Sequence, residues 1–214
     1  MSKSVYSLVL RDEIVEKLDR LAYSRNTNRS SLINQILAEY VSYVTPEKRM
    51  RDIFDRLEDL LRGDRFEVML QPSESMFSLR SSLAYKYNPN VRYSVELYQD
   101  RYPVVGVLRV SLRSQNSTLL LYLLQFFKLF SGIEQEFLGT TDHTIEPGRF
   151  TRTLTLRQLP PPEPEQIGQA IADYIALTDG AMQLWFGDLN DPHTAAARIE
   201  RLYRTYISTG NRLL

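Results

Sequence analysis

The chain has 214 residues, 43% of them hydrophobic and 24% charged, so it can bury a core of ordinary size and is not of the disordered class. A chain of this length holds one large domain, or a small module followed by a larger one. The formal net charge is zero, so no overall field marks nucleic acid as a partner.

Two further features exclude classes of site and location. The chain has no cysteine, which excludes a disulfide framework and a thiolate metal site. Its longest apolar run, residues 119–130, contains Gln125 and Lys128 and is too short to span a bilayer. No apolar signal segment precedes the first alternating stretch, and we therefore expect a cytoplasmic protein.

The first 45 residues predict a strand followed by two helices. Residues 5–10 alternate as a strand does, and residues 11–25 have the period of an amphipathic helix with Asp12 as its N-cap. Asn26 tolerates the left-handed conformation that often ends a helix, and Asn28 can cap a second helix that Thr45 and Pro46 interrupt. One strand face carries Tyr6, Leu8 and Leu10, and the other carries Val5, Ser7 and Val9.

A lone strand leaves its backbone groups unpaired and its apolar face uncovered. The simplest remedy is a second copy of the chain, with two strands paired antiparallel about a two-fold axis and four helices covering the face of Tyr6, Leu8 and Leu10. The sequence therefore predicts an obligate homodimer.

This order of elements, with NRSSLI beginning the second helix, resembles the ribbon–helix–helix family of Arc/MetJ/CopG-type repressors. The resemblance covers residues 4–45, about a fifth of the chain. It implies a dimer that lays its antiparallel ribbon in the major groove of double-stranded DNA. By matched position, the resemblance implies that Val5, Ser7 and Val9 face the bases. It also implies that the start of the second helix, at Asn28, Arg29 and Ser30, binds phosphate.

The residues depart from this family in two respects. Base-reading positions there usually carry hydrogen-bonding side chains, whereas two valines flank Ser7 here. A valine can contact a thymine methyl group but cannot make the bidentate hydrogen bonds that discriminate between bases by about 1–3 kcal/mol each. Residues 1–50 carry a modest positive charge, and we expect Lys3, Arg11 and Arg29 to supply it locally at the ribbon ends and helix starts.

The rest of the chain predicts a connecting helix over residues 46–63 and an α+β domain over residues 64–214. Strand-like alternation occurs around Phe66, from Leu79 to Tyr87, from Val91 to Leu97, from Val104 to Leu112 and from Phe150 to Arg157. Short turns between the first four predict an antiparallel sheet of about five strands with helices on one face. A buried helix is expected over residues 116–138 and two helices at the end, the last capped by Asp191 and Pro192.

This larger domain carries no recognisable catalytic motif. We find no GxGxxG, P-loop, GxSxG or HExxH sequence. His143, which we place in a polar loop, and His193 each lack a metal ligand or catalytic-triad partner at a characteristic spacing. We therefore expect no enzyme, no cofactor and no metal. Aromatic residues (Tyr85, Tyr93, Trp185 and Phe186) are expected in the core rather than in a ligand cage. One polar sheet face is predicted to be basic, and it comprises Arg80, Lys86, Arg92, Arg109, Arg113 and Arg157. Such a face could hold an anionic effector or add a second nucleic-acid contact, and the alternatives are a solvated face or one buried in a dimer contact.

The sequence thus favours a homodimeric, nucleoid-associated transcriptional regulator, a repressor of the prokaryotic kind, that binds double-stranded DNA. Its larger domain would bind a small-molecule or protein effector, or extend the oligomer. Two alternatives remain open. One is a DNA-binding partner protein, either an antitoxin or a plasmid-partition accessory, and the other is a dimeric scaffold that does not bind DNA.

Overall fold

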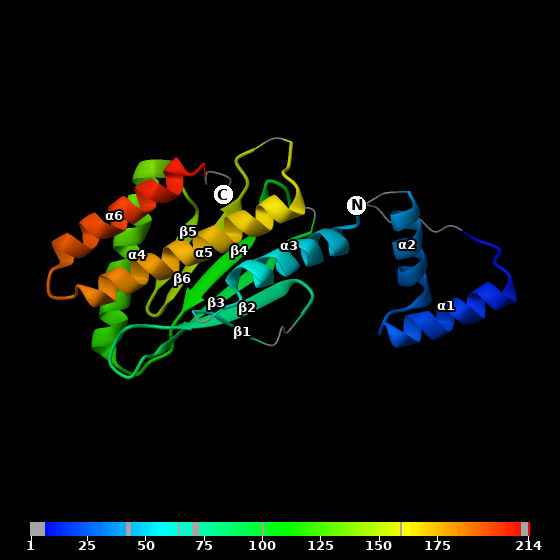
Figure 1. Ribbon diagram of the computed structural model, residues 1–214, viewed down its shortest axis with the longest axis horizontal. Coiled ribbons are helices and arrows are strands. Elements are labelled where there is room, and N and C mark those ends of the chain that lie inside the picture. The colour runs from blue at the N-terminus through cyan, green and yellow to red at the C-terminus, as the bar shows by residue number, and fades with distance from the viewer. Residues whose placement is uncertain are drawn as a thin grey trace. The chain divides into compact units, whose positions relative to one another are not determined.

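A computed structural model describes residues 7–41, 44–63, 65–69, 73–99, 101–158, 160–210 and 214. Over these residues the chain is an α+β protein with six helices and one antiparallel sheet of six strands (Figure 1). It divides into two compact units, Met1–Arg49 and Met50–Leu214, which are considered separately.

The first unit contains helices α1 (Asp12–Ser24) and α2 (Arg29–Tyr40). Between them Asn26 adopts φ 49°, the left-handed conformation that its residue type predicts. Asn28 is the N-cap of α2, and its side chain accepts a hydrogen bond from the Ser31 backbone N–H at 2.9 Å. The N-cap predicted for α1 is wrong by one position, because Arg11 occupies it and Asp12 begins the helix.

The strand predicted over residues 5–10 is not among the strands of this single chain. Residues 7–10 have no regular secondary structure, and Val5 and Tyr6 lie outside the described residues. A strand whose partner is a second copy has no ladder within one chain. The ribbon therefore stays a prediction.

Helix α3 (Pro46–Leu61) lies where the connecting helix is predicted and leads into the second unit. Charged residues separate its apolar positions, which recur at intervals of three and four. They form one buried stripe, consisting of Met50, Ile53, Phe54, Leu57 and Leu61.

The sheet has the strand order β1-β2-β3-β4-β6-β5, and every neighbouring pair is antiparallel. The interior position of β4 agrees with the apolar character of both its faces at its start. In chain order the strands are β1 (Glu67–Val68), β2 (Met76–Ser82), β3 (Asn90–Leu97), β4 (Val104–Ser111), β5 (His143–Glu146) and β6 (Arg149–Thr155).

The helices of the second unit pack on one face of this sheet (Figure 1). They are α3, α4 (Ser117–Leu138), α5 (Pro164–Gly187) and α6 (Pro192–Ser208). Ring stacking joins the two layers: Phe54 of α3 lies 5.8 Å from Phe77 of β2, and Phe127 of α4 lies 5.3 Å from Phe150 of β6. Alternate strand residues face these helices, and those between them form what we call the open face of the sheet.

Three sequence predictions for the sheet are wrong in detail. His143 lies in β5 rather than in a polar loop, which adds a sixth strand. The second strand ends at Ser82 instead of Tyr87, and the turn that follows contains Tyr87 and Asn88, both at positive φ (64° and 44°). The expected first strand is reduced to two residues among those described.

Candidate functional site

The predicted base-reading residues are exposed where the structure describes them. Ser7 is exposed, and Val9 is fully exposed. Val5 and the predicted phosphate ligand Lys3 lie outside the described residues. Arg11 is exposed at the start of α1.

At the start of α2, two of the three predicted phosphate ligands, Asn28 and Arg29, make contacts within the first unit. Ser30 is exposed, and Asn28 is occupied as a helix cap. The guanidinium of Arg29 donates two hydrogen bonds to the carboxylate of Asp19 on α1, at 2.6 and 2.5 Å. The hydrogen bonds from Arg29 hold the pKa of Asp19 below its usual value, and the same contact raises the pKa of Arg29. Both side chains are about half exposed, so the pair can exchange partners.

The first unit exposes much apolar surface in a single chain. Ala22, Leu32 and Ala38 are the buried hydrophobic residues described before Met50. Most of the large hydrophobic side chains that are exposed in the described chain belong to this unit. They are Leu8, Val9, Leu10, Ile14, Leu21, Tyr23, Ile36, Leu37, Tyr40, Val41 and Val44, against Leu60, Tyr87, Tyr102 and Leu121 in the remainder.

The structure separates the predicted basic sheet face into two groups. The cross-strand register places Arg80, Arg92 and Arg109 on the open face. The other three lie outside the strands: Lys86 in the turn after β2, Arg113 beyond the end of β4, and Arg157 beyond the end of β6, where it donates to the Leu138 carbonyl at 2.7 Å. Glu96 pairs with Arg109 at 2.7 Å, so the open face is of mixed charge.

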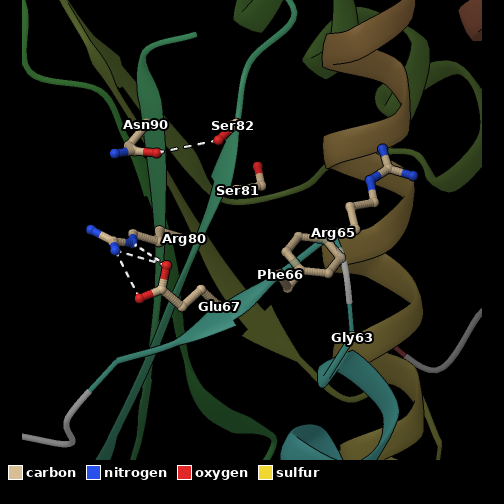
Figure 2. A pocket seen from close by; sticks show the side chains of 8 residues that line it. All are labelled: Gly63, Arg65, Phe66, Glu67, Arg80, Ser81, Ser82 and Asn90. Atoms are coloured by element: carbon tan, nitrogen blue, oxygen red, sulfur yellow. Dashed lines mark hydrogen bonds and ion pairs between the residues drawn. The ribbon is translucent and has the colours of Figure 1, made fainter.

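A small polar pocket of about 130 Å³ lies at the end of this face where β1 meets β2 (Figure 2). The Arg80 guanidinium makes two hydrogen bonds to the Glu67 carboxylate, at 2.8 and 2.7 Å. The Ser82 hydroxyl donates to Asn90 Oδ1 at 3.5 Å. The pocket is lined by Gly63, Arg65, Phe66, Glu67, Arg80, Ser81, Ser82 and Asn90.

Behind this pocket, a buried carboxylate joins α5 to the sheet. Asp179 is fully buried and accepts hydrogen bonds from the Ser81 hydroxyl at 2.5 Å and the Tyr93 hydroxyl at 2.8 Å. It also pairs with Arg65, whose side chain is half exposed. Burial, together with the nearby charge of Asp179, raises the pKa of Tyr93 well above its usual value. The phenol therefore stays neutral and acts as a hydrogen-bond donor.

A second buried network lies within the core. Arg152 of β6 faces the helices, and its Nε lies 2.9 Å from Glu134 Oε1, with both side chains almost completely buried. The Arg152 guanidinium lies 4.6 Å from the centre of the Tyr174 ring, and the Tyr203 hydroxyl lies 3.3 Å from Glu134 Oε1. Burial acts to lower the pKa of Arg152, but electrostatic interactions with Tyr174 and with the Glu134 carboxylate outweigh it and raise that pKa. This is a charge pair enclosed by aromatic rings.

Both networks escaped the sequence analysis, although the sequence holds a sign of each. Arg152 shares the parity of Phe150 and Leu154 along β6, which places it on the core face. Asp179 and Glu134 each occur within a largely apolar helix, where a charged side chain needs a partner.

The two histidines lie apart from both networks. His143 lies against Phe150, with 5.9 Å between the ring centres, and His193 is exposed at the start of α6. Tyr93, Trp185 and Phe186 are buried, as predicted. The described residues contain no group of three or more His, Asp or Glu side chains placed to hold a metal ion. Within the same ranges no helix has the length and apolar character needed to cross a membrane.

Comparison with known proteins adds no relative: no family model, curated protein or solved structure matches the chain. The fold and any function therefore have to be argued from the residues of this chain alone.

Proposed function

We propose that the protein is a homodimeric, sequence-specific DNA-binding regulator of transcription. Residues 5–10 of two chains would form an antiparallel ribbon of the ribbon–helix–helix kind, and this ribbon would enter the major groove. The cytoplasm, on the nucleoid, is the corresponding location.

The observation that carries the proposal is the first unit itself. An alternating segment is followed by α1, a left-handed Asn26 and an α2 capped by Asn28, which is the order of elements in that family. The unit has too few buried apolar residues for a core of its own, and Leu8 and Leu37 are about half exposed or more. A second copy would cover this surface, since two identical strands can pair about a two-fold axis.

DNA binding is supported by the residues left on the outer side of such a ribbon. Val9 and Ser7 are exposed, so a dimer that forms through the opposite face of the strand could leave both side chains accessible to DNA. The N-terminus of α2 presents backbone N–H groups and the positive end of the helix dipole, which favour a phosphate. Val5, Ser7 and Val9 would read a short pseudo-palindrome, with the valines against thymine methyl groups and Ser7 against a base edge.

The test uses the full-length chain and random-sequence duplex DNA. Repeated selection is expected to enrich a short pseudo-palindrome. Uracil in place of thymine, one position at a time, removes only the methyl group, and it should weaken binding at the few positions beside Val5 and Val9. Ser7→Ala should alter the preference at one base pair in each half-site and leave non-specific binding unchanged.

Two outcomes would overturn the proposal. If the protein is dimeric but selection enriches no DNA sequence, the first unit serves only to join two chains, as in a dimeric scaffold. If a sequence is enriched but uracil substitution and Ser7→Ala change nothing, the ribbon does not read the DNA.

A further inference from the structure

We propose that the open face of the sheet holds a binding site for a compact dianionic oxyanion, a phosphate group, at the β2–β3 end. We call it the Arg80 site, and it consists of Arg80, Arg92, Ser82 and Asn90 beside the pocket of Figure 2. The proposal does not rest on DNA binding, and either can fail without the other.

The first observation is an unbalanced pair of positive charges. Arg80 and Arg92 lie directly opposite each other on neighbouring strands and on the same face. Like charges in this position destabilise a sheet. Glu67 compensates Arg80, but among the described residues no carboxylate pairs with Arg92, whose contact is a 3.3 Å hydrogen bond to the Ser78 hydroxyl. An anion between the two guanidinium groups would remove the repulsion.

The second observation is a neutral donor, the Asn90 amide, beside them. Ser82 and Asn90 form the next directly opposed pair on the same face, and both are exposed. Asn90 accepts from Ser82 through Oδ1, so its Nδ2 group keeps donors for a ligand. Two guanidinium groups, with the Asn90 amide that Ser82 contacts at one end of the hairpin, supply donors for the acceptor oxygens of a phosphate.

Arg80, Ser82 and Asn90 line the pocket and Arg92 lies outside its lining, and the size of this pocket favours a compact ligand. At about 130 Å³ it is well below the roughly 300 Å³ at which pockets for drug-sized molecules begin. A single phosphate group therefore fits better than a nucleotide.

Glu67 already shows how the site engages an oxyanion. Its carboxylate makes a two-point contact with Arg80, the geometry in which a guanidinium also binds a phosphate. The Glu67 side chain is 65% exposed and that of Arg80 is 42% exposed, so solvent screens the pair and it exchanges readily. Glu67 is thus an internal competitor for the ligand. Removal of the Glu67 carboxylate must therefore strengthen binding of the anion.

The experiment is a calorimetric titration of the full-length chain with inorganic phosphate at constant ionic strength, together with the chemical shifts of the Ser82 and Asn90 amides. Glu67→Gln should tighten binding by about two- to fivefold, the value of an exposed ion pair. Arg80→Gln and Arg92→Gln should each weaken it by about tenfold or more. Arg149→Gln is the matched control, since Arg149 lies in the same cross-strand row but pairs with Glu146, and it should change nothing.

Three results would overturn the assignment. The first is no saturable phosphate binding by either the parent chain or Glu67→Gln, a variant that keeps the side-chain shape. The second is an equal loss in Arg149→Gln and Arg92→Gln, which would mean a diffuse positive field. The third is acetate binding as tight as phosphate, which would mean a carboxylate site. Thermal melting of each variant separates lost binding from lost folding.

Discussion

At the scale of single residues, the pairing of Arg29 with Asp19 changes what the first unit offers to DNA. The sequence marks Arg29 as a phosphate ligand, yet its guanidinium is engaged by a carboxylate in the free chain. In the proposed complex a phosphate would reach Arg29 only by displacing Asp19, which would couple DNA affinity to an acidic residue outside the proposed set of phosphate ligands.

We predict that Asp19→Asn strengthens binding to all DNA sequences and steepens the salt dependence. An Arg29 released from Asp19 can contact phosphate. Each such contact makes the negative slope of log K against log salt steeper by about 0.9. Fluorescence anisotropy of a labelled duplex at several salt concentrations measures it.

Glu16→Gln is the control, because Glu16 is a carboxylate of α1 that pairs with Arg20 instead. The gain should vanish in the double variant Asp19→Asn/Arg29→Ala. If the gain in DNA affinity survives Arg29→Ala, the cause is the change in net charge and not the release of Arg29.

The pair of Arg152 and Glu134 is the residue-scale feature of the core. Removal of one partner leaves an uncompensated buried charge, which typically costs about 3–5 kcal/mol, whereas apolar replacement of both is often neutral. We predict that Arg152→Met lowers the free energy of unfolding by that amount and that Glu134→Leu in the same chain restores most of it. Urea denaturation followed by circular dichroism measures both. Failure of the double variant to recover stability would indicate that Tyr174 and Tyr203 need the charges.

At the scale of elements, local signals predicted the helices better than the strands. Asn28, Asn116 and the pair Asp191–Pro192 each cap or begin a helix as their residue types predict, because capping depends on a few adjacent residues. Strand β5 was missed because it is short and gains its backbone partners from β6, which is a tertiary effect.

The candidate sites show the same division between features set by local sequence and features set by tertiary contacts. The arginines of the open face follow from strand parity, so Arg80, Arg92 and Arg109 could be placed on one face from the sequence. Lys86 was misplaced, because the strand ends at Ser82 and Lys86 lies in the turn that follows, although the alternation of residue types continues to Tyr87. The partners of these arginines and the contact of Arg29 with Asp19 depend on packing, which spacing along the chain does not encode.

Packing of α3 against α5 depends on a glycine. A Cβ at Gly168 would lie 2.9 Å from both the Ile53 carbonyl oxygen and Arg56 Cβ, so the two helix backbones approach closely there. Gly132, in the interior of α4, has nothing within 4 Å of that position. We predict that Gly168→Ala destabilises the second unit by about 1–3 kcal/mol through overpacking.

Gly132→Ala is the matched control and should stabilise by about 0.5–1 kcal/mol, since it gains only helix propensity. Thermal unfolding of both variants measures the difference in sign. An equal response of the two would mean that α3 and α5 adjust freely at Gly168.

At the scale of the whole molecule, the two units differ in how far each is stabilised by its own residues. The second unit has a continuous core from α3 through the sheet to α6, whereas the first buries little beyond Ala22, Leu32 and Ala38. Stability roughly follows the apolar area removed from water, so we expect the first unit, unlike the second, to depend on the proposed second copy of the chain. Loss of the partner should therefore unfold one unit and spare the other.

We predict that the full-length chain is a dimer at micromolar concentration and that Leu8→Asp makes it monomeric, because the change places an uncompensated charge in the buried face of the proposed ribbon. The second unit should keep its melting transition while the helical signal of α1 and α2 is lost. Leu121→Asp is the matched control: Leu121 lies in α4 and is 52% exposed, against 62% for Leu8, so the same charge is added to similar exposed apolar surface. Sedimentation velocity with circular dichroism measures both properties. A monomeric parent chain would remove the basis of the ribbon. Dissociation by Leu121→Asp but not by Leu8→Asp would place the dimer contact in the second unit instead.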